Sequence, residues 1–328
     1  MNRRWVCNDV WMDMFPFFDR PQLGLKMALI SPRFEVLVDK HFDGQSELTI
    51  WREIIIHKRG TKAKLRLSME HIFVDLQLPK CPLPNKIRFE DLQIYYIDYS
   101  VIAFLSSNKH VFDKGTNLGL RVSNQWPIWD VLVHEIWPIF APNIRHLYFY
   151  DAGHLQYLSR FISPTILFDL KRLNSMYSGD LLPAVIHDFD GPNAISAGQA
   201  LSEWLHTPRS DGKPKELCCT YIKAPKAGKW LNKFKEEFLR STASANYIIT
   251  LVFRSKTPAI EPFELVNERT EEKLTLEEEA YSGAWLLKRH KIGETAEVQR
   301  KGDTKLKNGV YFCLNGNRCI GPLSPPND

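Results

Sequence analysis

Segments with the alternating pattern of β-strands are separated by amphipathic helical segments through most of this 328-residue chain. The two kinds of segment alternate from about residue 87 to residue 253, with a repeat of roughly thirty residues. Parallel strands are joined by right-handed crossovers, and helices between the strands supply them. The sequence therefore predicts a parallel sheet with helices packed on it, which places this region in the α/β class.

The individual elements follow from the period of their apolar residues. Strands are predicted at residues 87–97, 118–122, 144–150, 173–177, 216–222 and 247–253. Helices are predicted at residues 100–105, 128–140, 154–161, 194–206 and 226–240. Only residues 143–149 read like the strand of a leucine-rich repeat. The pattern leaves two architectures open, a curved leucine-rich-repeat-like array and a compact α/β sheet.

Shorter β segments precede and follow this region. Before it, a small antiparallel meander is predicted at residues 48–57, 64–69 and 73–78, and residues 79–84 form a proline-rich linker. After it, a hairpin is predicted at residues 264–267 and 273–276, and the regular pattern ends at residues 284–289. With helices ahead of the meander, the chain as a whole is predicted to be α+β.

The chain is expected to end in a disordered tail, because the sequence is polar and unpatterned from about residue 293. Four regions are therefore expected: residues 1–45, 46–84, 85–292 and 293–328.

Apolar residues recur at helical spacing in the first 45 residues. A first helix, with Asn8 or Asp9 as N-cap, would carry one apolar face: Val10, Trp11, Met14, Phe15 and Phe18. Pro21 suits the first turn of a second helix. The second and third helices would carry Leu23, Met27, Ile30, Phe34, Leu37, Val38 and Phe42. Three short helices cannot bury this surface by themselves, so the segment is either a docking module or a helical cap on the rest of the chain.

The order of features in this segment resembles an F-box. The segment has the same succession of features as that family. A first helix is followed by a turn of the form Asp-x-Pro-x-Leu at residues 19–23, then by a second helix, a polar break and Arg33-Phe34. Val6 and Cys7 stand where the family usually has Leu-Pro, so Cys7 departs from its pattern. The resemblance implies that the segment binds the Skp-type adaptor of a cullin–RING ubiquitin ligase. The residues expected at that contact are Val6, Cys7, Val10, Trp11, Met14, Phe15, Phe18, Pro21 and Leu23.

A second resemblance covers about residues 5–290. Several segments of the chain are similar to nematode F-box proteins that carry an F-box-associated α/β region. These segments are residues 82–89, 96–105, 136–138 with 143–144, 39–42 and 262–268. This resemblance implies a substrate-recognition subunit of an SCF-type ubiquitin ligase, with no chemistry and no cofactor of its own. The α/β region would hold a target protein, whose identity the resemblance does not supply.

Net charge, cysteine spacing and the length of apolar stretches indicate which kinds of partner and which cellular compartment to expect. A net charge of +5 with dispersed basic residues gives no indication of nucleic-acid binding. The six cysteines form no Cys-x-x-Cys motif and no zinc-ligand spacing with histidine. We therefore expect reduced thiols in a cytoplasmic or nuclear protein. No apolar stretch is long enough for a signal peptide core or a membrane span, so no membrane association is expected.

Motifs for catalysis or metal binding are weak in this sequence. There is no phosphate-binding loop, nucleophile elbow or His-Glu-x-x-His. His134-Glu135 would bind a metal only if it folded against His187, Asp188 and Asp190. No catalytic or metal-binding residue is therefore predicted. Two alternatives to the ligase subunit remain, an interaction scaffold that does not join a ligase and an unrecognised enzyme.

A candidate target surface follows from strand geometry, because alternate side chains point to opposite faces. The inward set is expected to be Leu118, Leu120, Val122, Ile144, Leu147 and Phe149. The outward set, expected to contact the target, is Gln93, Tyr95, Arg121, Tyr148, Tyr150, Thr220 and Thr250. Tyr and Arg suit protein recognition because they combine a large contact area with a polar tip. The alternative is that the Tyr rings merely cover the sheet.

Overall fold

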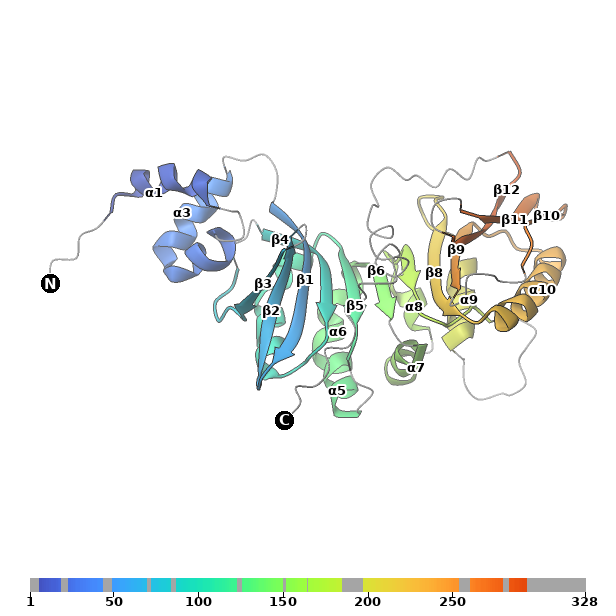
Figure 1. The fold of residues 1–328 in the computed structure, drawn as a ribbon, viewed down its shortest axis with the longest axis horizontal. Coiled ribbons are helices and arrows are strands. Elements are labelled where there is room, and N and C mark those ends of the chain that lie inside the picture. The colour runs from blue at the N-terminus through green and yellow to red at the C-terminus, as the bar shows by residue number, and fades with distance from the viewer. Residues whose placement is uncertain are drawn as a thin grey trace. The chain divides into compact units, whose positions relative to one another are not determined.

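The computed structural model describes residues 6–18, 23–43, 49–69, 72–83, 87–122, 126–149, 152–163, 165–184, 197–253, 260–279 and 283–293. The predicted tail lies outside these residues. The chain divides into two compact units, residues 1–204 and residues 205–328. Figure 1 labels the elements of both units along the chain.

The first unit begins with an N-terminal helical module, the described residues between 6 and 43. Its elements are α1 (Asn8–Met14), η1 (Phe15–Phe17), η2 (Leu23–Met27), η3 (Ala28–Ile30) and α3 (Pro32–Asp43). The predicted second helix is thus a π turn followed by a 3-10 turn. Ser31 then has an extended backbone, as expected before a proline, and its carbonyl accepts a hydrogen bond from Glu35 N at the start of α3.

The sheet of the first unit is mixed. Its strand order is β3 (Ile72–Gln77), β2 (Lys62–Met69), β1 (Thr49–Arg59), β4 (Ile87–Ile94), β5 (Thr116–Leu120), β6 (Ile144–Phe149) and β7 (Ser175–Tyr177). Strands β1, β2 and β3 form the predicted antiparallel meander. Strand β1 also pairs in parallel with β4. The meander is therefore continuous with the α/β sheet, although the sequence analysis placed the two in separate regions.

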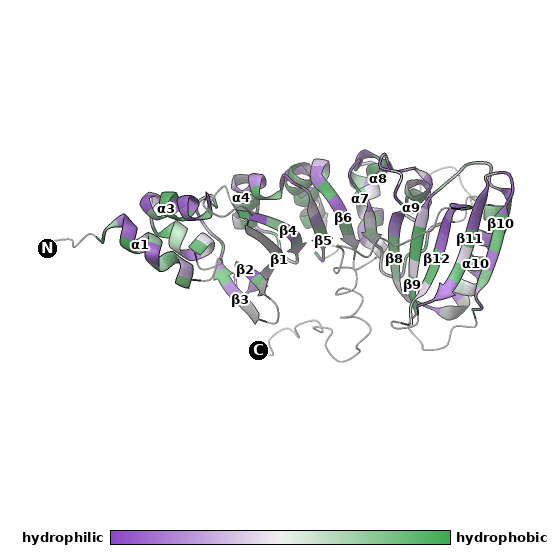
Figure 2. Ribbon diagram, turned by 90° about the horizontal axis from the view of Figure 1, so that it is seen from above, coloured by the Kyte–Doolittle hydropathy of each residue, from purple (hydrophilic) through white to green (hydrophobic). Residues whose placement is uncertain are grey.

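The crossovers of the first unit are helical, as predicted. They contain α4 (Tyr99–Ser107), η4 (Lys109–Phe112), α5 (Trp126–Val131), η5 (Leu132–Ile136), α6 (Trp137–Phe140), η6 (Ala141–Asn143), α7 (Ala152–Phe161) and α8 (Ile166–Asp169). The helix predicted at residues 128–140 is divided by a π turn before Pro138. Proline lacks the N–H that a continuous α-helix needs at this position. Figure 2 shows helices along one side of strands β4 to β6.

The predicted inward residues of this sheet are buried. Leu118, Leu120, Val122, Ile144, Leu147 and Phe149 are each at most 6% exposed. Phe112 and Phe140 of the crossovers are buried as well, and their rings meet edge to face with centroids 5.0 Å apart. Burial of such side chains supplies most of the folding free energy of this layer.

The second unit combines one parallel strand pair with an antiparallel sheet. Its strand order is β8 (Lys215–Ile222), β9 (Tyr247–Phe253), β12 (Trp285–Lys291), β11 (Glu272–Glu278) and β10 (Phe263–Asn267). The helix α10 (Ala224–Arg240) connects the parallel strands β8 and β9, and α9 (Ala197–His206) precedes them. The apolar face of α10 is buried and carries Trp230, Leu231, Phe234 and Phe238. On α10, Lys235 Nζ lies 3.8 Å from the ring centroid of Phe263 on β10.

Strand β12 was not predicted. It pairs with β9 and with β11, so it separates the predicted hairpin from the parallel pair. In all, the described residues contain twelve strands, and the fold is mixed α/β. Because antiparallel strands make up part of both units, the structure does not show the leucine-rich-repeat-like array. No helix of the described residues is both long and apolar enough to cross a membrane.

Candidate functional site

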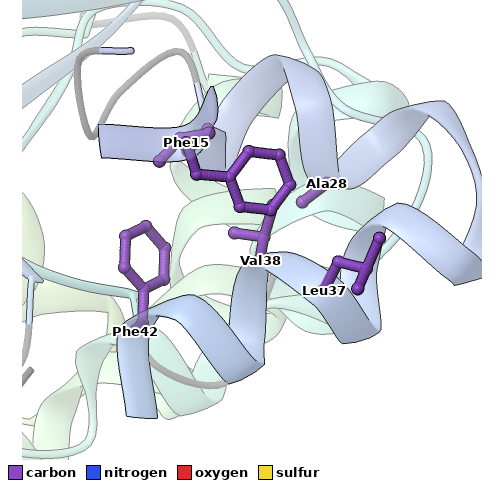
Figure 3. Close-up of a cluster of buried hydrophobic side chains, with 6 residues drawn as sticks. Phe15, Ala28, Leu37, Val38 and Phe42 are labelled. Atoms are coloured by element: carbon purple, nitrogen blue, oxygen red, sulfur yellow. The ribbon is translucent and has the colours of Figure 1, made fainter. Parts of the chain in front are cut away.

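The N-terminal helical module has a small core of its own. Six side chains from the segments after α1 are at most 5% exposed: Phe15, Leu23, Ala28, Leu37, Val38 and Phe42. Figure 3 shows Phe15 directed from the end of α1 toward Val38 and Leu37 on α3. The module therefore buries part of its apolar surface within itself.

Polar and aromatic contacts hold α1 against α3. Arg33 on α3 donates from Nε to Oδ1 of Asn8 at 2.8 Å and from Nη2 to the carbonyl oxygen of Val6 at 2.6 Å. The rings of Trp11 and Phe34 meet edge to face with centroids 4.9 Å apart. The position of the chain entering α1 is therefore set by α3.

A second set of apolar side chains in the module faces outward. On and around α1, Val6, Val10 and Met14 are 42%, 47% and 41% exposed, and Phe17 is 88% exposed. Ile30 and Val36 are also exposed. Large apolar side chains this open, grouped on one short segment, are typical of a contact surface.

The predicted adaptor residues fall into three groups in the structure. Val6, Cys7, Val10 and Met14 are exposed, and Trp11 and Phe18 are half-buried. Phe15 and Leu23 are 0% and 1% exposed and belong to the core, so neither is available on the surface. Pro21 lies outside the described residues. Phe17, on the 3-10 turn that follows α1, was not among the predicted contact residues, although it stands seven residues after Val10 and three after Met14.

Polar side chains form rows across the sheet of the first unit. One row joins Glu53, Asp91, Asn117, His146 and Ser175 on five neighbouring strands. A second row joins Ile55, Gln93, Gly119, Tyr148 and Tyr177. We call the face that carries these two rows the polar face. The alternate residues, such as Leu92 and Leu118, are fully buried.

Several contacts fix the side chains of the polar face. Asn117 Nδ2 donates to Oδ1 of Asp91 at 2.5 Å. The side-chain amide of Gln93 occupies the space that a Cβ on Gly119 would need, so a larger residue there would displace the amide. The rings of Tyr148 and Tyr177 lie 6.3 Å apart between centroids. These neighbours hold the surface in one conformation.

The end of the polar face carries Tyr95 and Arg121. Tyr95 N donates to the carbonyl oxygen of Ile56, and Arg121 N donates to that of Ile94. The Arg121 guanidinium lies 5.5 Å from the centroid of the Tyr95 ring. Arg121 is exposed and Tyr95 is half-buried.

The structure brings four of the predicted target residues together. Gln93, Tyr95, Arg121 and Tyr148 lie on the polar face, although Gln93 is only 5% exposed. Thr220 and Thr250 belong to β8 and β9 of the second unit, and Thr220 is fully buried. Tyr150 lies outside the described residues. Asn117, His146 and Tyr177 also lie on the polar face but were not predicted. Their alternation with buried residues along the strands is the pattern that could have indicated this position.

An ionic cluster lies on the β1–β3 meander. Asp75 accepts from Arg66 Nε at 2.7 Å and from Arg59 Nη1 at 2.8 Å, and His57 Nε2 lies 3.3 Å from it. The hydrogen bond from Arg66 lowers the pKa of Asp75 to about 2, against the opposing effect of burial. Asp75 is therefore ionised over the physiological range and fixes the positions of the two guanidinium groups.

The second unit contains a buried ion pair. Arg289 on β12 and Glu272 on β11 are each 1% exposed, and Arg289 Nη2 donates to Glu272 Oε2 at 2.6 Å. Glu272 also accepts from Ala245 N at 2.7 Å, and Arg289 donates to the carbonyl oxygen of Ala243 at 2.6 Å. These bonds attach the loop after α10 to the sheet. A cavity beside Arg289 of about 10 Å³ has room for about one water molecule.

Three ionisable groups of the second unit have shifted pKa values. Burial raises the pKa of the Tyr247 hydroxyl well above its usual range. Burial, and then the charge of Arg209, lowers the pKa of Lys215 to about 8. Arg209 lowers the pKa of Asp211 by hydrogen bonding to it. Desolvation and a neighbouring cation account for these shifts without any reacting group.

The remaining features of the described residues are the positions of possible metal ligands and an apolar groove. The described residues contain no group of three or more His, Cys, Asp or Glu side chains placed to hold a metal ion. His134 instead lies 3.5 Å from Asp130, one turn away, and His187, Asp188 and Asp190 are outside the described residues. A groove of about 450 Å³ is lined mainly by apolar residues, among them Trp137, Pro142 and Ile166.

Comparison with protein-family models, curated proteins and solved structures finds no match for this chain.

Proposed function

We propose that this chain is the substrate-recognition subunit of an SCF-type cullin–RING ubiquitin ligase. In this proposal the N-terminal helical module is an F-box that binds the Skp-type adaptor. The α/β body then holds a target protein on the polar face. The chain presents the target and supplies no chemistry or cofactor.

The observation that carries the proposal is the division of apolar residues in the module. Phe15, Leu23 and Val38, which follow α1 in the chain, make a core, while Val10 and Met14 on α1 remain exposed. A partner that covered these exposed side chains would remove a large apolar area from water. The F-box resemblance of residues 5–45 supplies the identity of that partner.

The polar face supports the second half of the proposal. It presents Tyr95, Tyr148 and Arg121, the residue types enriched where proteins bind one another. Their backbone positions are fixed by neighbouring strands, so the surface is preorganised. Preorganised side chains lose less conformational entropy on binding.

Co-purification of the full chain with the Skp-type adaptor tests the adaptor contact. The test variant is Val10→Glu/Met14→Glu, which places two charges among the exposed apolar residues of α1. The control is Leu239→Glu/Val266→Glu in the second unit, where both residues are apolar and 47% and 45% exposed. We expect the test variant to lose the adaptor and the control to retain it. If native protein does not bind the adaptor, the proposal is wrong and the scaffold function is favoured.

The target contact needs its own experiment. Arg121→Ala/Tyr148→Ala removes two side chains of the polar face while leaving the strand backbone and the N-terminal module unchanged. We expect this variant to co-purify with the adaptor as native protein does, but to lose target proteins identified with the native chain. The paired control is Arg160→Ala/Tyr157→Ala on α7, which removes the same side-chain types from a crossover helix. Equal loss in both variants would place target binding elsewhere.

A further inference from the structure

The cationic residues of the β1–β2 hairpin lie on the same side as the polar face. Ile55 belongs to the polar face and pairs with Arg66, and His57, two residues along β1, pairs with Lys64. The next residues on this side, Arg59 and Lys62, are also paired with each other. Four cationic side chains therefore gather on one surface: Arg59, Lys62, Lys64 and Arg66. We call them the cationic corner.

The carboxylate within the cationic corner does not neutralise it. Asp75 pairs across the strands with Arg66 and accepts hydrogen bonds from Arg66 and Arg59. Lys62 and Lys64 form no ion pair with any residue in the described part of the chain. Lys62 is exposed and Lys64 is half-buried, so both ammonium groups are available to a partner.

The row that contains Lys64 continues onto the end of the polar face. Ile56 pairs with Ile94, so the next residues, His57 and Tyr95, are neighbours. Arg121 lies beyond Tyr95, with its guanidinium over the ring. A ligand that lies along β2 at Lys64 would thus have Tyr95 and Arg121 beside it on the neighbouring strands.

Protection of a sheet edge does not account for both lysines. Natural edge strands often carry Lys to discourage pairing with another chain. In the sheet of the first unit β3 is the outermost strand, and its last residue, Gln77, pairs with Lys64. Lys62 lies beyond the end of β3, where β2 itself is the edge. Edge protection therefore explains Lys62 but not Lys64.

We propose that the cationic corner binds an acidic, extended segment of the target protein. This deepens the proposed function by naming the chemical class of the target. Lys62, Lys64 and Arg66 lie on alternate positions of β2, about 7 Å apart. A peptide in extended conformation presents its alternate side chains at the same spacing. Carboxylate or phosphate groups at alternate positions of such a peptide match the spacing of these three side chains along β2.

A short acidic segment fits better than a long polyanion. Glu53 and Asp91 occupy the opposite end of the polar face, four residues from His57 and Tyr95 on their strands. That distance is about 13 Å. A nucleic-acid strand running along the face would therefore be repelled at its far end, whereas a peptide with acidic residues at one end would not.

Fluorescence anisotropy with the purified full chain tests this inference. The probe is a fluorescein-labelled peptide of Gly and Ser with Glu at three alternate positions. Two further probes carry phosphoserine at those positions or the same three Glu residues in one run. We expect both alternate-position probes to bind more tightly than the contiguous one. We expect their affinity to fall as salt rises, because exposed charges are screened.

Charge reversal identifies the surface that binds. Lys62→Glu/Lys64→Glu should lower affinity by about tenfold or more. Lys109→Glu/Lys171→Glu makes the same change in net charge at exposed positions in the crossovers and should leave affinity nearly unchanged. A milder variant, Lys62→Gln/Lys64→Gln, should give an intermediate loss and serves if the reversal impairs folding.

Three outcomes would overturn the inference. The first is that native protein does not bind acidic peptides. The second is that the Lys62/Lys64 and Lys109/Lys171 variants lose equal affinity for the peptide. The third is that native protein binds single-stranded RNA more tightly than an acidic peptide of equal charge. Adaptor co-purification is measured on the same samples. If the protein binds the peptide but not the adaptor, the ligase function is refuted and peptide binding by the cationic corner is supported. If it binds the adaptor but not the peptide, the ligase function is supported and peptide binding by the cationic corner is refuted.

Discussion

Arg33 and Asn8, 25 residues apart in the sequence, are joined by two hydrogen bonds from one guanidinium group. Nε and Nη2 of Arg33 lie 2.8 Å and 2.6 Å from Oδ1 of Asn8. The sequence pattern predicted Asn8 or Asp9 as the N-cap of α1, but Cys7 holds that position and makes no side-chain cap. Asn8 instead connects the start of α1 to α3.

A double-mutant cycle measures this connection. We expect Asn8→Ala and Arg33→Ala each to lower the local stability of α1 by about 1 kcal/mol, because each removes the exposed, charge-assisted bonds between the two side chains. Arg33→Ala also removes the bond to the carbonyl oxygen of Val6, so the double variant should be little worse than Arg33→Ala. Hydrogen exchange of residues 8–14 is the measurement, and Lys40→Ala on α3 is the control. Fully additive effects would show that the two residues act independently.

Gly119 should not tolerate a methyl group while Gln93 is present. Gly119→Ala places a Cβ where the Gln93 amide lies, and overpacking of this kind costs about 1–3 kcal/mol. Gln93→Ala in the same chain should recover most of the loss in thermal unfolding. Gly228→Ala is the control, because nothing lies within 4 Å of its added Cβ and it sits inside α10. It should stabilise the protein by several tenths of a kcal/mol, since Ala favours helix. Failure of the rescue would contradict the steric explanation.

The buried pair of the second unit should be sensitive to loss of one partner. Arg289→Met leaves Glu272 charged and buried, which costs about 3–5 kcal/mol. Lys288→Met, the neighbouring residue on β12, removes an ion pair to the exposed Glu277 and should cost less than about 1 kcal/mol. Urea unfolding followed by circular dichroism gives both values. Equal costs would mean that burial does not set the contribution of the pair.

Acid should remove the contribution of Asp75 to stability. Its pKa is lowered to about 2 in the folded protein, so the folded state favours the ionised form relative to the unfolded chain. This contribution is complete above about pH 4, the unfolded value, and is lost as the pH falls through about 2. The stability difference between native protein and Asp75→Asn should therefore shrink over that window. A difference that stays constant from pH 7 to pH 2 would contradict the lowered pKa.

The cysteines should differ in reactivity but not in oxidation state. Cys7 and Cys81 are exposed, Cys218 and Cys219 are at most 1% exposed, and none of these four described cysteines is in a disulfide. Peptide-level mass spectrometry after brief alkylation should show Cys7 and Cys81 labelled in native protein. Cys218 and Cys219 should be labelled only after unfolding. Unfolded, non-reduced protein should contain six free thiols, and any disulfide would contradict the expected reducing compartment.

The sequence by itself determined the type and approximate place of most elements. The strands at residues 144–150 and 247–253 and the helix at residues 226–240 correspond to β6, β9 and α10 within two residues at each end. This succeeded because hydrophobic period is a local property that each segment carries in its own residues. Strand parity likewise identified the inward residues and placed Tyr95, Arg121 and Tyr148 on the opposite side.

Only the tertiary structure decided which strands are neighbours. The pairing of β1 with β4 and the position of β12 between β9 and β11 depend on backbone hydrogen bonds between distant segments. Local period carries no record of such partners, because every strand presents the same backbone donors and acceptors. The same reason applies to the surfaces. Lys64 lies in one row with Tyr95 only because strand order and register bring β2, β1 and β4 together. Phe15 and Leu23 are removed from the contact surface only because the helices of the module pack over them.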